Sequence, residues 1–122
     1  DTRVLMDPFL TGNPKAAADP AELDPTHIFL THGHPDHYGD IVDIAKRTGA
    51  QCVAIVECAN ELGDKGVENV ADPNLGGTVE FDWGSVKLVQ AFHTNTMPGS
   101  GDNPFSAGSF SLAGVTKTLA PS

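Results

Sequence analysis

Short apolar runs separated by polar and glycine-rich stretches recur along this 122-residue chain. Three runs in its first half are apolar almost throughout, as is typical of strands buried on both faces, and they cover residues 3–6, 27–31 and 51–56. Between the second and third runs, apolar side chains recur with helical spacing (Ile41, Ile44 and Ala45), which predicts a helix over 38–48. A second, short helix is expected over 57–62, ended by Gly63.

The second half of the chain has the pattern of β-structure. Strands are predicted at 67–70, 78–81 and 86–92, with weaker candidates at 107–112 and 116–119. Residues 82–85 have the composition of a hairpin turn between two of these strands. The order strand–helix–strand–helix followed by strands predicts an α/β or α+β fold. The chain begins without Met in one strand-like run and ends just after another, so we expect residues 1–122 to form one partial domain.

Charge and composition narrow the possible partners. Seven Lys and Arg oppose sixteen Asp and Glu, for a net charge of −9, and no basic patch is visible, so a nucleic-acid partner is not expected. No apolar run approaches the roughly 20 residues of a membrane span, and no signal-peptide pattern is visible. Two cysteines do not make a disulfide framework. Together these features predict a cytoplasmic protein that does not associate with membranes.

A cluster of metal-binding side chains follows the second apolar run. Over residues 31–37 the sequence is Thr-His-Gly-His-Pro-Asp-His. Side chains at i and i+2 share a face where the backbone is extended, so His32 and His34 can reach one ion. Imidazole and carboxylate ligands suit zinc, and also iron, manganese or nickel. His27 lies outside the cluster, at the start of the strand, and is predicted to have a structural role.

The pattern His-x-His-x-Asp-His is the signature of the metallo-β-lactamase superfamily. Within that superfamily, the chain resembles the UPF0173 group of metal-dependent hydrolases. The matching segments are VLMDPFLTGNP (4–14), THGHPDHYGD (31–40), IAKRTGA (44–50), GVENV (66–70), GGTVEF (76–81) and AFH (91–93). The resemblance implies an α+β fold: the N-terminal part of an αββα sandwich, without its first strands and its C-terminal half.

The resemblance also implies roles for individual residues. His32, His34 and His93 match the ligands of a first metal ion, and Asp36 and His37 match two ligands of a second. Asp36 would also orient or deprotonate the attacking water. Asp7 matches an aspartate that hydrogen-bonds metal-binding histidines. The implied cofactor is one or two Zn²⁺ ions, with Mn²⁺, Fe²⁺ or Ni²⁺ as alternatives.

The departures from the family pattern keep several functions open. Similar proteins have a later aspartate that bridges two metals and a late histidine, but residues 103–122 contain neither Asp nor His. The implied function is hydrolysis of a small-molecule ester, lactone, amide or phosphoester by metal-activated water. The alternatives are a non-catalytic metal-binding fragment, which could self-associate through exposed core surface, and a nuclease, which the acidity disfavours. Oxygen-reducing di-iron relatives typically have Glu at the position of His34.

Overall fold

The computed structural model describes residues 1–93 and the backbone of a strand at 114–119. The elements along the chain are β1 (Val4–Met6), the 3₁₀ turn η1 (Pro20–Glu22), β2 (His27–Phe29), α1 (Pro35–Tyr38), α2 (Ile41–Thr48), β3 (Gln51–Val53), α3 (Val56–Asp64), β4 (Val70–Ala71), β5 (Thr78–Phe81), β6 (Gly84–Val89) and β7 (Gly114–Leu119). In the part of the chain that the structure describes, no helix has the length and apolar character to cross a membrane.

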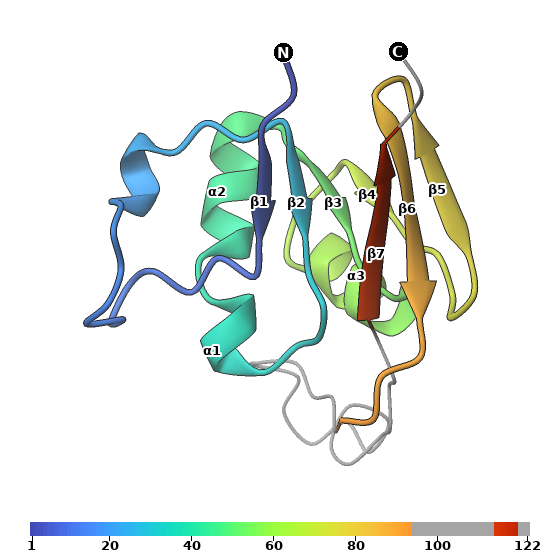
Figure 1. The fold of residues 1–122 in the computed structure, drawn as a ribbon. Coiled ribbons are helices and arrows are strands. Elements are labelled where there is room, and N and C mark those ends of the chain that lie inside the picture. The colour runs from blue at the N-terminus through green and yellow to red at the C-terminus, as the bar shows by residue number, and fades with distance from the viewer. Residues whose placement is uncertain (94–113, 120–122) are drawn as a thin grey trace.

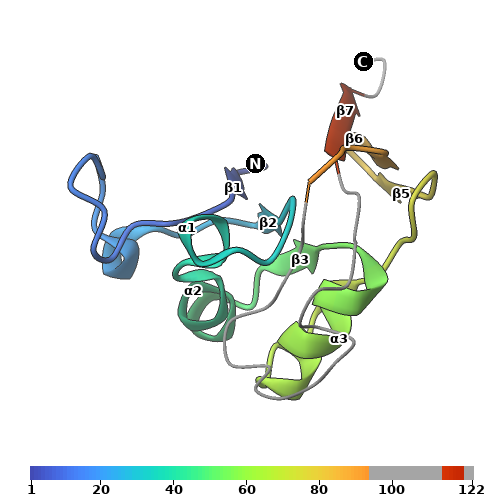
Figure 2. The same cartoon turned by 90° about the horizontal axis from the view of Figure 1, so that it is seen from below.

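The first four strands form a parallel sheet in the order β1-β2-β3-β4. Figure 2 shows helices α2 and α3 on one side of this sheet and the second sheet on the other. In the register of β2 and β3, Ile28 lies beside Cys52 and Phe29 beside Val53. All four side chains are fully buried, as expected for strands covered on both faces. This confirms the interpretation of the second and third apolar runs as buried strands. The prediction was wrong for the first run, because β1 lies at the edge of the sheet and Val4 and Met6 are exposed.

The second sheet is antiparallel, in the order β5-β6-β7 (Figure 1). It packs on the first sheet through aromatic rings. The rings of Phe81 and Trp83 stack with their centroids 4.9 Å apart. Both rings also lie 6.3 Å from the ring of Phe29 in β2. Such contacts between aromatic side chains hold two sheet faces together beyond the effect of area burial alone.

The predicted helix over 38–48 is in fact two helices that separate at Gly39 and Asp40. Gly39 has a φ of +44°, a backbone angle that residues with a Cβ atom rarely adopt. A Cβ on Gly39 would also lie 2.4 Å from the carbonyl oxygen of Pro8. The break therefore results from the close approach of a distant segment, which the helical spacing of Ile41, Ile44 and Ala45 could not reveal.

Other boundaries differ from the prediction by a few residues. The strand expected over 51–56 ends at Val53 because α3 begins at Val56, and α3 continues through Gly63 instead of ending there. The strand expected at 86–92 is observed as β6, which begins two residues earlier and ends at Val89. The strand expected at 67–70 shares only Val70 with β4. The hairpin turn is shorter than 82–85, since Gly84 already pairs with Phe81. The weak strand at 116–119 is observed as β7, and the one at 107–112 lies outside the described residues.

One face of the edge strand β1 remains apolar and exposed. Val4 and Met6 are 36% and 48% exposed. They pair in register with His27 and Phe29, so they lie on the face that meets the second sheet. The predicted self-association through exposed core surface stays a prediction, and these two side chains are where it would begin.

Candidate metal centre

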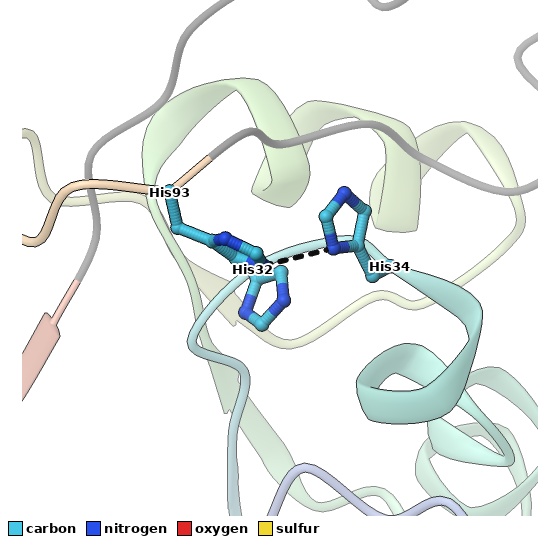
Figure 3. A group of neighbouring side chains, drawn as sticks. All are labelled: His32, His34 and His93. Atoms are coloured by element: carbon cyan, nitrogen blue, oxygen red, sulfur yellow. Dashed lines mark hydrogen bonds between the residues drawn. The ribbon is translucent and has the colours of Figure 1, made fainter.

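Three histidines from two distant parts of the chain converge beyond the end of β2 (Figure 3). His32 and His34 lie in the loop between β2 and α1, and His93 follows β6. Each pair of rings has its centroids 4.7 Å apart, and each pair is close to perpendicular. One potential ligand atom from each residue lies within 4.8 Å of the other two. The structure thus brings together the three residues predicted for the first metal.

The distances are close to those that a metal ion requires. Ligand atoms bound to one zinc at 2.0–2.1 Å with tetrahedral angles lie about 3.4 Å apart. His93 Nε2 and His34 Nδ1 are 3.1 Å apart, which is within this spacing. Side-chain movements of about an ångström would therefore be enough to close the group around an ion.

His32 provides the strongest sign that the group fits a ligand. Its side chain is buried, and its Nε2 atom has no hydrogen-bond partner among the residues that the structure describes. An unpaired polar atom in a protein interior costs free energy, so native structures rarely keep one without a function. A divalent ion is the partner that matches three converging imidazoles.

A hydrogen-bond network sets which nitrogen of His32 carries its proton. The Thr31 hydroxyl donates to Asp7 Oδ2 at 2.6 Å, and the Thr31 N–H donates to Oδ1 at 2.8 Å. Because the hydroxyl hydrogen is engaged with Asp7, the Thr31 oxygen is left to accept from His32 Nδ1 at 2.9 Å. This arrangement protonates Nδ1 and leaves the Nε2 lone pair for a metal.

Asp7 orients His37 as well. His37 Nδ1 lies 3.0 Å from Asp7 Oδ2, so its proton is directed at the carboxylate. The predicted role of Asp7 as a partner of site histidines agrees with these contacts. Thr31 was not among the predicted site residues. Its position directly before His32 was the only sign of its role, and that sign is weak because Thr26 precedes His27 in the same way.

Burial and neighbouring charge keep His32 neutral. Burial, and then the charges of His37, His34 and His93, lower the pKa of His32 to about 4, although Asp7 opposes the shift. At neutral pH the side chain is therefore uncharged. Only an unprotonated imidazole nitrogen can bind a metal, so the environment maintains the binding form.

The residues predicted for a second metal, Asp36 and His37, lie beside the three histidines. The His37 ring centroid is 4.2 Å from that of His32. Asp36 is exposed at the start of α1, and its Oδ2 atom is 3.9 Å from His37 Nε2. Within the described residues, no third potential ligand joins these two in a metal-binding group.

Comparison with known proteins agrees with the fold and the cluster. The family described as the metallo-beta-lactamase superfamily matches residues 1–108. This chain belongs to that superfamily. A UPF0173 metal-dependent hydrolase of Methanopyrus kandleri is 50% identical over 99 residues, which are 81% of this chain and 43% of that protein. Another, of Ligilactobacillus salivarius, is 48% identical over 92 residues, or 75% of this chain and 42% of that protein. The chain thus spans about two fifths of the length of these curated relatives.

Solved structures show the same fold. Igni18, a metallo hydrolase of Ignicoccus hospitalis, matches 95% of this chain and 48% of its own, with a TM-score of 0.72 and 25% identity. CmlA, a diiron β-hydroxylase of Streptomyces venezuelae, matches 98% of this chain and 24% of its own, with a TM-score of 0.68 and 18% identity. The second likeness concerns the fold alone. These findings confirm the resemblance and the fold class inferred from the sequence.

Proposed function

We propose that this chain carries the three-histidine metal centre of a hydrolase that acts on a small molecule. The observation that carries the proposal is the buried Nε2 atom of His32, which has no hydrogen-bond partner in the described part of the chain and lies beside His34 and His93. The relatives named as metal-dependent hydrolases support the same class of reaction. The activity, the substrate and the partners of the whole protein belong to this proposal.

In this proposal His32, His34 and His93 hold one divalent ion, and zinc is the first choice because imidazole nitrogens suit it. Manganese, iron and nickel are the alternatives. A bound ion of this kind acidifies water and polarises the carbonyl or phosphoryl group to be cleaved. The protein would then need no Ser or Cys nucleophile.

Asp36 would accept the proton of the attacking water. Its carboxylate is exposed to solvent two residues after His34, and its Oδ2 atom lies 3.9 Å from His37 Nε2, beside the three histidines. His37, held by Asp7, would keep an unprotonated Nε2 next to Asp36. These two residues would form one side of a second metal position.

The substrate class follows from charge and chemistry. An ester, lactone, amide or phosphoester can all be cleaved by activated water. A net charge of −9 makes a nucleic-acid backbone an unfavourable partner, so the nuclease alternative ranks below a small-molecule substrate.

One observation favours a second candidate, a metal-binding chain without catalytic activity. Asp36 and His37 are not joined by a third ligand within the described residues. With one ion only, control of the attacking water would be weaker, and turnover could be lost while metal binding persists.

The test is to strip the purified chain of metal, reload it with zinc or manganese, and measure both bound metal and turnover. A lactone, a carboxylic ester and a phosphodiester serve as substrates. We expect at least one bound ion and hydrolysis of one of these substrates. Asp36→Asn should keep the metal and lose turnover, whereas Asp43→Asn, an exposed change in α2, should alter neither. Bound metal without turnover would favour the second candidate, and absence of metal would contradict both.

A further inference from the structure

Asp7 is at the centre of the hydrogen bonds that orient the site histidines. The orientation of these histidines therefore depends on the contacts that keep Asp7 in place. Its carboxylate accepts from Thr31 N–H, the Thr31 hydroxyl and His37 Nδ1. Its backbone has φ of +46°, and it is the one non-glycine residue in the described part of the chain with a positive φ. A residue in this region of φ and ψ stays there only when its surroundings hold it.

The segment that follows Asp7 is a loop with a few hydrogen bonds of its own, such as that from Asn13 Nδ2 to Phe9 O at 2.9 Å. Residues 7–13, here named the Asp7 loop, contain no helix or strand. The backbone of Asp7 donates to Phe29 O at 2.9 Å, which fixes the start of the loop to β2. The rest of the loop runs past the junction of α1 and α2 (Figure 1).

Asp40, at that junction, holds the Asp7 loop with both carboxylate oxygens. Oδ2 accepts the N–H groups of Leu10 at 3.0 Å and Thr11 at 2.8 Å. Oδ1 accepts the hydroxyl of Thr11 at 2.6 Å. The backbone N–H of Asp40 adds a bond to Pro8 O at 2.9 Å. Asp40 thus makes four hydrogen bonds to the loop that begins at Asp7.

This use of the Asp40 side chain is unusual for its position. Asp40 is the N-cap residue of α2, where an aspartate ordinarily accepts from the first N–H groups of the helix. Here the side chain makes no such capping bond. Burial raises the pKa of Asp40, but the hydrogen bonds from Thr11 and Leu10 outweigh it and hold the pKa below its usual value. The Asp40 carboxylate therefore accepts hydrogen bonds from the Asp7 loop and not from the first turn of α2.

We propose that Asp40 is a positioning residue of the metal centre, because its hydrogen bonds to the Asp7 loop keep the Asp7 carboxylate within hydrogen-bond distance of Thr31 and His37. The chain of contacts runs from Asp40 to residues 8–11, from there to Asp7, and from Asp7 to the Nδ1 protons of His37 and, through Thr31, of His32. Gly39 permits this contact, since any Cβ at this position would strike Pro8 and Phe9. The inference rests on the proposed function, since a positioning role supposes that the histidines bind a metal. The contacts themselves can be tested without metal or substrate.

The test compares three variants of the metal-free chain by nitrogen-detected NMR of the histidine rings at pH 8. Asp40→Ser keeps a good N-cap residue for α2 but is too short to reach Leu10 and Thr11. Asp40→Asn can still accept both N–H groups through its amide oxygen and donate to the Thr11 hydroxyl. Asp43→Ser removes a carboxylate from the first turn of the same helix, where the side chain is exposed.

In the wild type we expect His37 as a single tautomer with its proton on Nδ1. Asp40→Ser should lose that signature and show a mixture of the two tautomers, and Asp40→Asn and Asp43→Ser should retain it. A role confined to stability would lower the melting temperature of Asp40→Ser while His37 kept its Nδ1 proton, and that result would overturn the proposal. Because the readout uses no metal and no substrate, it is independent of whether the chain hydrolyses anything.

If Asp40→Ser does not fold, amide hydrogen exchange of the wild type decides. The Leu10 and Thr11 amides report on release from Asp40, and the Thr31 amide reports on release from Asp7. Opening of one linked unit should give all three amides the same protection within roughly threefold. If the Thr31 amide is protected from exchange about a hundredfold more than the Leu10 and Thr11 amides, Asp7 stays in place when the hydrogen bonds to Asp40 open. That result would overturn the proposal.

Discussion

Two Thr-His pairs lie at the two ends of strand β2, and they share one hydrogen bond but differ in what surrounds it. At the amino end, Thr26 Oγ1 is 2.8 Å from His27 Nδ1. At the carboxyl end, Thr31 Oγ1 is 2.9 Å from His32 Nδ1. In both pairs the threonine hydroxyl donates elsewhere, to Arg3 O or to Asp7. Both histidines therefore carry their proton on Nδ1, and burial lowers the pKa of both.

The difference lies at Nε2. The Nε2 lone pair of His27 faces the indole N–H of Trp83 at 3.5 Å, and the ring packs edge-on against Phe81 and Trp83. The Nε2 atom of His32 has no hydrogen-bond partner within residues 1–93, and its ring lies beside the imidazoles of His34 and His93. His27 lies within β2, under Phe81 and Trp83, whereas His32 lies in the loop that follows β2, beside His34 and His93. The same local chemistry thus makes a structural residue at one end and a candidate ligand at the other.

The largest expected effect is on metal affinity. His32→Ala should abolish zinc binding, because the loss of a ligand exceeds the 10–100-fold loss that removal of an outer hydrogen-bond partner typically causes. His27→Ala should keep the wild-type affinity. Competition with a chromophoric chelator measures both, and an equal loss in the two variants would contradict the distinction between the two histidines.

The threonines give the next largest contrast. Thr31→Val keeps the shape of the side chain but removes the link from Asp7 to His32, so zinc affinity should fall about 10–100-fold. Thr26→Val makes the same change beside His27 and should leave zinc affinity unchanged. The same chelator competition applies, and a Thr31→Val protein with wild-type affinity would mean that the relay to Asp7 does not orient His32.

Stability should respond in the opposite order. His27→Ala removes a ring packed against two aromatic side chains and should lower the free energy of unfolding by about 2 kcal/mol. In the metal-free protein, His32→Ala should cost less, because it also removes a buried nitrogen that has no partner. Urea denaturation of both variants tests this. A larger cost for His32→Ala would show that its ring is mainly a core residue.

The smallest effect concerns pH. The pKa of His27 is lowered in the folded protein, so protonation favours the unfolded chain. Its contribution to stability is present above the ordinary pKa of about 6.5 and is lost as the pH falls. His27→Phe should remove that dependence, so stability should fall less between pH 7 and 5 than in the wild type. Urea denaturation of the metal-free proteins at both pH values measures the difference. An equal loss of stability between pH 7 and 5 in the two proteins would exclude a half-buried, neutral His27.

Much of the fold was accessible from sequence because its signals are local. The apolar runs of β2 and β3 reflect burial on both faces, which shows in composition alone. The run of β1 has the same composition, although one face of that edge strand is exposed. The motif at 31–37 indicated metal ligands because four such side chains follow one buried strand. The break between α1 and α2 was missed, since it depends on Pro8 lying against Gly39, a contact between segments 31 residues apart. The end of β3 was missed because Val56 suits a strand and a helix equally in an apolar run.

By itself, then, the sequence determined the family, the strand that carries the site and the candidate ligands His32, His34 and His93. Only the tertiary structure decided which of two Thr-His pairs has an unpartnered nitrogen. It also decided that Thr31 connects Asp7 to His32, and that Asp40 serves a loop instead of its own helix. The physical reason is that a hydrogen bond satisfied or left open depends on the groups that folding brings alongside. For these residues the decisive partners lie 24 to 59 positions away in the chain.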